Sequence, residues 1–358
     1  MAPVIAALRR RLLQERHVVV HTGQHYDRSM SELFIKQLEL GRPDYFLDVG
    51  SASHAVQTAR IMERIEPVLE REAPDLVIVA GDVNSTLAAT LAAVKLGIRI
   101  AHVESGLRSF DRTMPEEINR IVADEFSEYL FVHSDEGVAN LRAEGIAEER
   151  IHFVGNTMID TLVAMEPAFR AARAANRMGV RPGEYLLVTL HRPALVDGPL
   201  LQRVIDELSA TARRLPVIFP AHPRTRRMLG PLDAPGLTLT EPLSYIDFLS
   251  LEADAAAVLT DSGGIQEETT FLGVRCFTLR DNTERPVTVR LGTNTLLGLD
   301  PSRIAEIPES LATEAVAVAT APPLWDGQAS ERVADVLLSP SSGALRVRNT
   351  AAYAEGSH

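Results

Sequence analysis

Short runs of apolar, mostly β-branched residues alternate along the chain with longer segments in which apolar residues recur every three or four positions. The runs in the first half are HVVVHTGQ from residue 17, DLVIVAGD from 75, RIAHVESG from 99 and YLFVHSDE from 129. Each run ends in turn-forming or polar residues, which is typical of a buried parallel strand. Between two of these runs, the following apolar residues have the spacing of an amphipathic helix: Ala55, Ala59, Met62, Ile65 and Leu69. The pattern predicts a parallel sheet covered by helices.

A second series of the same kind begins after an Ala/Arg-rich stretch that extends to about Gly183. Its strand-like runs are YLLVTLH from 185, PVIFPAH from 216, AAVLTD from 256 and CFTLR from 276. Two such series predict an α/β protein with two Rossmann-like, doubly wound domains that face a cleft with their strand C-termini. We place an N-terminal domain at 1–165, a C-terminal domain at 166–325, a C-terminal helix at 326–338 and a disordered tail at 339–358.

Composition narrows the class of protein. The 358 residues carry 36 Lys and Arg against 48 Asp and Glu, a net charge of −12, which argues against a general binder of nucleic acid or anionic membranes. Cys276 is the single cysteine and cannot form an internal disulfide, so a cytoplasmic location fits best. No apolar run approaches the roughly 18 residues of a membrane span.

Polar side chains directly follow five of the strand-like runs. They are Asp82, Glu104, His191, His222 and Asp261. In open α/β sheets, ligands bind at the edge formed by the carboxyl ends of the strands, so these residues are candidates for a site. For any one of them, the alternative is a helix cap or an ordinary loop group, and the Asp before Ser-Gly-Gly fits a cap best.

The string TDSGGIQEE (260–268) has the features of an anion site. Two glycines after an apolar strand let a ligand approach the backbone closely, and the following helix presents unpaired amides to a phosphate or diphosphate. Glu268, about one turn further on, could accept hydrogen bonds from ribose hydroxyls. The alternative is a plain strand-to-helix turn. The chain has neither the dinucleotide-binding glycine motif nor a P-loop, so no cofactor is expected.

The string PEEINR (115–120) opens a helix with two carboxylates, Glu116 and Glu117. Taken alone, they are capping charges that the helix dipole favours. Together with Asp82 and Glu104 they form a carboxylate cluster, which suits proton transfer. No metal is expected, because the following histidines lack the spacing of ligands: His21, His25, His54 and His102.

The chain resembles the non-hydrolysing UDP-N-acetylglucosamine 2-epimerases from Met1 to about Leu338. The strings that carry the resemblance are TGQH (22–25), GDVNST (81–86), HVESGLRS (102–109), MPEEINR (114–120), VGN (154–156), TLHR (189–192), EPLSYIDF (241–248), TDSGGIQEE (260–268) and LRDNTERP (279–286). The family implies a glycosyltransferase-B-like pair of domains, a homodimer, and a nucleotide held mainly by the second domain.

The implied reaction inverts carbon 2 of UDP-GlcNAc to give UDP-ManNAc. UDP leaves by elimination, 2-acetamidoglucal stays bound, and UDP adds back on the other face. One group must remove the carbon-2 proton, another must return it from the opposite face, and donors must stabilise the leaving diphosphate. No redox cofactor is needed.

The family's functional residues fall on named positions of this chain. The resemblance implies this acid/base set: Asp82, Glu104, Glu116 and His191. It implies these contacts to the UDP-sugar: His222, Ser262, Gly263, Gly264, Glu268 and Arg285. An activating second UDP-GlcNAc would bind at Gln24, His25 and Arg60.

The sequence departs from the family pattern in three places. Ala194 and Leu195 replace the usual Glu and Asn after the TLHR string, and Asp27 replaces a Gln of the activating site. Family members also carry a first strand, a Gly-Thr-Arg-Pro-Glu turn and a Lys ahead of the residue that is Met1 here. The N-terminal domain is therefore expected to lack its first strand and two cations.

Other functions stay open at this stage. A 2-epimerase of a related UDP-sugar, such as a UDP-diacetamido-uronic acid, is the first alternative. A hydrolysing epimerase would release ManNAc and UDP, and a nucleotide-sugar-binding protein without catalysis would bind UDP-GlcNAc without exchanging its carbon-2 hydrogen.

Overall fold

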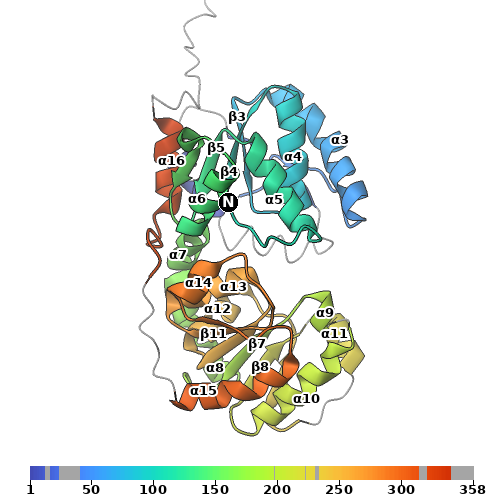
Figure 1. The fold of residues 1–358 in the computed structure, drawn as a ribbon, viewed down its shortest axis with the longest axis vertical. Coiled ribbons are helices and arrows are strands. Elements are labelled where there is room, and N and C mark those ends of the chain that lie inside the picture. Colours follow the sequence, from blue (N-terminus) through green and yellow to red (C-terminus); the bar gives the residue numbers. More distant parts are fainter. Residues whose placement is uncertain are drawn as a thin grey trace, which may run out of the picture. The chain divides into compact units, whose positions relative to one another are not determined.

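The computed structural model describes residues 1–12, 17–23, 41–196, 198–221, 223–229, 234–313 and 321–339. The chain forms two compact units (Figure 1). Unit 1 comprises the described residues of Met1–Thr157 and Gln328–His358, and unit 2 those of Met158–Gly327. Each unit has a parallel sheet covered by helices, which confirms the predicted α/β class with two Rossmann-like units.

Unit 1 has two separate parallel sheets. A four-stranded sheet has the order β3-β4-β5-β6, and a two-stranded sheet pairs β1 with β2. The strands are β1 (Val20–His21), β2 (Tyr45–Phe46), β3 (Leu76–Ala80), β4 (Arg99–Val103), β5 (Tyr129–Val132) and β6 (Ile151–Phe153). In a doubly wound sheet the first strand lies between the second and the fourth. The two sheets of unit 1 are separated between β1 and β3. If β1 corresponds to the second strand of such a fold and β3 to the fourth, this break lies at the position of the first strand, which the family pattern led us to expect to be missing.

The helices of unit 1 cover these sheets. They are α1 (Ala2–Arg11), α3 (His54–Glu72), α4 (Asn84–Lys95), α5 (Pro115–Phe126), α6 (Asp135–Ala143) and α16 (Ala329–Leu338). The helix predicted over 55–69 is confirmed, and its predicted apolar face is confirmed in part. Ile65 and Leu69 lie in the core, but Ala55 and Ala59 are exposed and Ile61 is buried in addition, because branched side chains bury more apolar area than alanine.

The C-terminal helix α16 packs against α1 at the start of the chain. Val333 and Leu337 join Val4 and Leu8 in one apolar cluster. At the rim of this contact, Arg11 forms an ion pair of 2.6 Å with Asp335. Both ends of the described chain therefore belong to the core of unit 1.

Unit 2 has one six-stranded parallel sheet of order β12-β11-β10-β7-β8-β9. The strands are β7 (Leu186–Thr189), β8 (Val217–Pro220), β9 (Leu237–Thr240), β10 (Ala257–Thr260), β11 (Arg275–Thr278) and β12 (Asn294–Leu296). The order reverses between β7 and β10, which pair directly, with Thr189 opposite Thr260. Ligands of doubly wound sheets bind beyond the carboxyl ends of the strands at such a reversal.

Helices flank the sheet of unit 2. They are α7 (Thr157–Ala172), α8 (Ala174–Arg177), α9 (Pro193–Val196), α10 (Leu200–Ala212), α11 (Pro223–Leu229), α12 (Tyr245–Asp254), α13 (Gly263–Leu272), α14 (Pro286–Arg290) and α15 (Ile307–Thr313). Leu195, where the family has a polar residue, is fully buried in the core with β7 and α10. Among the described helices of both units, none has the length and apolar character needed to cross a membrane.

Candidate active site

Asp82 and Glu104 follow the adjacent strands β3 and β4, so the sheet brings them to one edge of unit 1. Gly81, between β3 and Asp82, turns the chain with a φ of +69°. A Cβ added at Gly81 would lie 3.8 Å from Oε2 of Glu104, so this carboxylate lies beside the turn that carries Asp82. The clustering of these two carboxylates with those of Glu116 and Glu117 stays a prediction.

Glu104 has a backbone conformation that side chains of L-residues rarely adopt. Its φ is +67°, in the left-handed region, directly after the last residue of strand β4, Val103. Such strain costs about 1–3 kcal/mol and is found mostly at functional sites. The Glu104 carboxylate makes no hydrogen bond or ion pair with any described residue, so it is available to a ligand.

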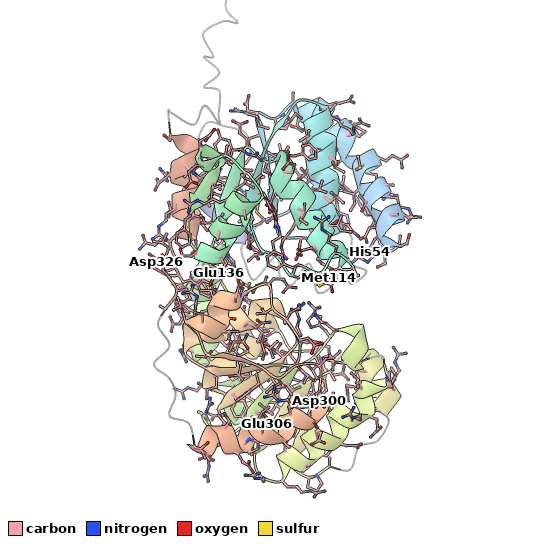
Figure 2. The ribbon with its side chains drawn as sticks, viewed as in Figure 1. His54, Met114, Glu136, Asp300, Glu306 and Asp326 are labelled. Atoms are coloured by element: carbon pink, nitrogen blue, oxygen red, sulfur yellow. The ribbon has the colours of Figure 1, made fainter. Side chains whose placement is uncertain are left out.

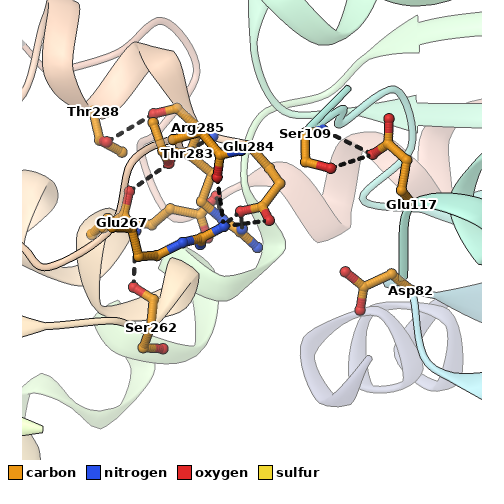
Figure 3. A network of polar contacts seen from close by, with 12 residues as sticks. Asp82, Ser109, Glu117, Ser262, Glu267, Thr283, Glu284, Arg285 and Thr288 are labelled. Carbon is orange, nitrogen blue, oxygen red and sulfur yellow. Dashed lines mark hydrogen bonds and ion pairs between the residues drawn. The ribbon is translucent and has the colours of Figure 1, made fainter. Parts of the chain in front are cut away.

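Glu116 lies in the first turn of helix α5, which begins at Pro115. Figure 2 labels Met114, the residue directly before this helix. The two neighbouring carboxylates have different surroundings. Glu117 is buried and accepts a hydrogen bond of 2.8 Å from the amide of Ser109 (Figure 3). It accepts a second one of 3.0 Å from the amide of Phe110. Glu116 is half-buried and has no hydrogen-bond partner among the described residues. Glu117 therefore holds the preceding loop, whereas the Glu116 carboxylate is not held by any described residue.

Beneath this edge lies a buried network that sequence reasoning missed. His102 on β4 places Nδ1 2.7 Å from Asp124 and Nε2 2.9 Å from the carbonyl oxygen of Gly81. Arg108 also pairs with Asp124 at 2.7 Å and binds Glu144 through two hydrogen bonds. Burial alone would raise the pKa of Asp124, but His102 and Arg108 hold it below its usual value. The network fixes the Gly81 turn from below.

In unit 2, His191 follows β7 and Asp261 follows β10, the two strands at the reversal of strand order. Nδ1 of His191 lies 2.8 Å from Oδ1 of Asp261, and the amides of His191 and Arg192 donate to the same carboxylate at 3.0 and 2.8 Å. The interpretation of Asp261 as a helix cap is wrong, since Ser262 occupies the N-cap of α13. Burial raises the pKa of Asp261, yet its bonds to His191 lower it overall.

The contact with Asp261 fixes the orientation of the His191 imidazole. Because Nδ1 donates to a carboxylate, Nε2 is directed away from Asp261. The His191 side chain is 62% exposed while Asp261 is fully buried. A buried carboxylate that fixes the tautomer of an exposed histidine is the arrangement used by general acid/base histidines.

The predicted anion site lies at the start of α13, where Ser262 is the N-cap and Gly263 the first residue. The guanidinium of Arg285 lies against this turn, because a Cβ on Gly263 would be only 2.2 Å from Nη1. Arg285 pairs with Glu267 at 3.0 Å and Glu284 at 3.5 Å (Figure 3). A cation beside the amino end of a helix suits a diphosphate.

Glu284, the acidic residue of the TERP string, is a second residue that the sequence did not reveal. It accepts two hydrogen bonds from Arg280, at 3.0 and 2.8 Å, and lies 3.9 Å from Arg192. Burial would raise its pKa, but Arg280 and Arg285 lower it to about 2. Glu284 therefore holds three arginines together near the anion site.

Glu268, the expected ribose contact, is almost fully buried on α13 and accepts a hydrogen bond of 2.9 Å from Tyr245. Burial raises its pKa to about 7. Its neighbour Glu252 on α12 is fully buried, and burial raises the pKa of that carboxyl well above its usual value. We infer that Glu252 keeps its proton, since two charged carboxylates at this depth would repel each other.

The remaining expected site residues are placed as follows. His222, Gln24 and His25 lie outside the described residues, and Arg60 is an exposed residue of α3, so the activating site stays a prediction. Within the described part of the chain, no group of His, Cys, Asp or Glu side chains is arranged to hold a metal ion.

Comparison with known proteins gives a consistent result. The family model described as UDP-N-acetylglucosamine 2-epimerase matches residues 8–338. A UDP-N-acetylglucosamine 2-epimerase of Methanococcus maripaludis is 41% identical over 324 residues, 87% of each chain. A UDP-2,3-diacetamido-2,3-dideoxy-D-glucuronate 2-epimerase of Pseudomonas aeruginosa is 41% identical over 298 residues, 81% of this chain and 82% of its own.

Among solved structures, the UDP-GlcNAc 2-epimerase of Methanocaldococcus jannaschii in complex with UDP-GlcNAc and UDP has a TM-score of 0.85. It is 39% identical and covers 94% of this chain and 95% of its own. The family match covers nearly the whole chain, including the polar residues that follow the strands of both units. This chain belongs to the UDP-N-acetylglucosamine 2-epimerase family.

Proposed function

We propose that this protein is a non-hydrolysing 2-epimerase that interconverts UDP-GlcNAc and UDP-ManNAc. The observation that carries the proposal is the set of acid/base groups at the strand ends of both units. Unit 1 supplies Asp82, Glu104 and Glu116, and unit 2 supplies His191 in a fixed orientation. The similarity to epimerases named for UDP-GlcNAc supports the choice of substrate.

The geometry suits an elimination followed by re-addition. A carboxylate without a protein partner, such as Glu104 or Glu116, can take the carbon-2 proton, and a second group can return it from the other face. The helix α13 amides and Arg285 can stabilise the charge of the departing UDP. Glu268 would accept hydrogen bonds from the ribose.

The direct test is incubation with UDP-GlcNAc in deuterium oxide. We expect deuterium at carbon 2 of both UDP-sugars, with UDP-ManNAc appearing and no accumulation of free ManNAc. Asp82→Asn, Glu104→Gln, Glu116→Gln and His191→Asn should each lower turnover about 100-fold or more. Glu125→Gln, an exposed position on α5, is the matched control and should keep normal turnover. Binding of UDP-GlcNAc without any exchange at carbon 2 would contradict the proposal.

A second candidate substrate is a UDP-diacetamido-uronic acid, because the Pseudomonas aeruginosa relative named for that sugar is as similar in identity as the archaeal epimerase. The same exchange experiment with both sugars decides between them through their kcat/KM values. We also propose a cytoplasmic homodimer. Light scattering should then give about twice the 39.1 kDa of the chain, and a monomer mass would contradict it.

A further inference from the structure

Helix α5 holds the Asp82 turn through two consecutive residues. Nδ2 of Asn119 donates to the carbonyl oxygen of Asp82 at 2.8 Å, and the guanidinium of Arg120 pairs with Oδ2 of its carboxylate. From below, His102 contacts the carbonyl oxygen of Gly81. The backbone and the side chain of Asp82 are therefore fixed by different residues.

The Arg120 guanidinium has no other carboxylate partner among the described residues. Arg120 is 2% exposed, and its Nε is buried without an acceptor in the described part of the chain. Burying a guanidinium with one donor unmet is costly, so the pair with Asp82 must compensate for it. The Asp82 side chain is 26% exposed, and Oδ1 makes no hydrogen bond to a described residue. One carboxylate oxygen is thus held and the other faces outward.

We propose that Arg120 is a positioning residue that orients the Asp82 carboxylate towards the sugar, with Asn119 fixing the backbone below it. The inference rests on the proposed function and adds a residue to it. Glu116 lies one helical turn before Arg120 on the same helix. Helix α5 therefore presents one acid/base group itself and aims a second.

The test is a double-mutant cycle read by deuterium exchange at carbon 2 of UDP-GlcNAc. Arg120→Met should lower kcat about 100-fold while KM stays within about threefold, because an oriented carboxylate matters more in the transition state than in binding. In an Asp82→Asn background, the same change should lower kcat less than about threefold, because Arg120 acts through Asp82. Arg120→Lys keeps the charge and should recover at least about tenfold of the loss.

Arg150→Met is the matched control. Arg150 binds the carbonyl oxygens of Asp124, Glu125 and Ser127 at the opposite end of α5, so its loss weakens the same helix without touching Asp82. We expect a lower melting temperature and a kcat within about twofold of the wild type.

Each outcome has a defined meaning. Equal losses from Arg120→Met in both backgrounds, or a kcat loss in Arg150→Met as large as in Arg120→Met, would overturn the inference. If Asp82→Asn shows no measurable exchange, the comparison of Lys with Met at position 120 decides, and equal turnover of the two variants would overturn it. An inactive wild type would overturn the proposed function and this inference with it.

Discussion

At the scale of single residues, Glu104 combines backbone strain with an unpartnered carboxylate. The left-handed conformation costs a residue with a Cβ about 1–2 kcal/mol, and Glu104→Gly relieves this strain in the folded state. Glycine also has more conformational freedom in the unfolded chain, which lowers the free energy of unfolding by about 0.5–1 kcal/mol. We therefore expect unchanged or slightly higher stability, by up to about 1 kcal/mol, together with a turnover lowered about 100-fold.

Urea unfolding and carbon-2 exchange measure the two effects. Ala73→Gly is the matched control, since Ala73 has a φ of +42° at the carboxyl end of α3 and no expected role in catalysis. It should gain similar stability and keep full turnover. A large loss of stability in Glu104→Gly would show that this side chain supports the fold.

The buried pair of Glu252 and Glu268 gives stability a pH dependence. The folded pKa of Glu268 is about 7, raised from 4.5 mainly by burial, so the folded state takes up a proton that the unfolded chain releases. Its stabilising contribution is complete below about pH 4.5 and is lost as the pH rises through about 7. Between pH 6 and 8 the free energy of unfolding should fall by about 1 kcal/mol from this group.

Glu268→Gln should flatten that dependence, because it removes the group that titrates. Urea midpoints at pH 6, 7 and 8 would show it, with Glu184→Gln at an exposed position of unit 2 as control. A variant curve as steep as that of the wild type would show that another group carries the pH dependence.

At the scale of elements, the amino end of α13 can lie against the Arg285 guanidinium because Gly263 has no side chain. In Gly263→Ala the new Cβ would meet the guanidinium of Arg285, which is the end of a flexible side chain and can move away. We expect stability within about 1 kcal/mol of the wild type but UDP binding weakened about tenfold or more, because the cation and the close approach of the phosphate are both lost. Isothermal titration with UDP measures this effect.

Gly273→Ala at the other end of α13 is the contrasting variant. Gly273 has a φ of +71° and open space around it, so alanine there costs about 1 kcal/mol in stability and should leave UDP affinity unchanged. Similar UDP affinities for the two variants would remove the helix end from the nucleotide site.

The strands that the sequence failed to predict lie at the edges of sheets. All eight predicted runs contain strands, among them β3, β4, β7 and β10. The strands β2, β6, β9 and β12 were not predicted, because two to four residues at or near the edge of a sheet carry too little apolar periodicity. The residues that follow strands were found by the same rule, since a parallel sheet gathers its carboxyl ends.

The partners of those residues could not be predicted. Asp261 contacts His191 only because β10 lies beside β7, and the order of strands in a sheet is not written in local sequence. The same holds for Arg120 with Asp82, which are 38 positions apart. Local patterns locate the candidate groups, but tertiary pairing decides which of them is oriented, buried or available.

At the scale of the whole molecule, the two units differ in how many segments of the chain form their cores. Unit 2 is continuous in sequence, from Met158 to Gly327, and its described strands form one sheet. Unit 1 joins the beginning of the chain to its end through α1 and α16. Contacts between residues so far apart in sequence carry a cost in loop-closure entropy that the core of unit 1 must offset.

The break in the sheet of unit 1 has a consequence for exchange of backbone hydrogens with solvent. Strand β3 pairs with β4 on one side and with no described strand on the other, whereas β10 is enclosed by β7 and β11. Every second amide of β3 therefore points away from its partner and has no ladder bond to protect it. In hydrogen exchange followed by mass spectrometry, peptides over 76–80 should gain deuterium much faster than peptides over 257–260. Equal protection would mean that another segment covers the β3 edge in solution. Faster exchange would show that the strand directly before Asp82 is an unprotected edge strand, next to the candidate catalytic edge of unit 1.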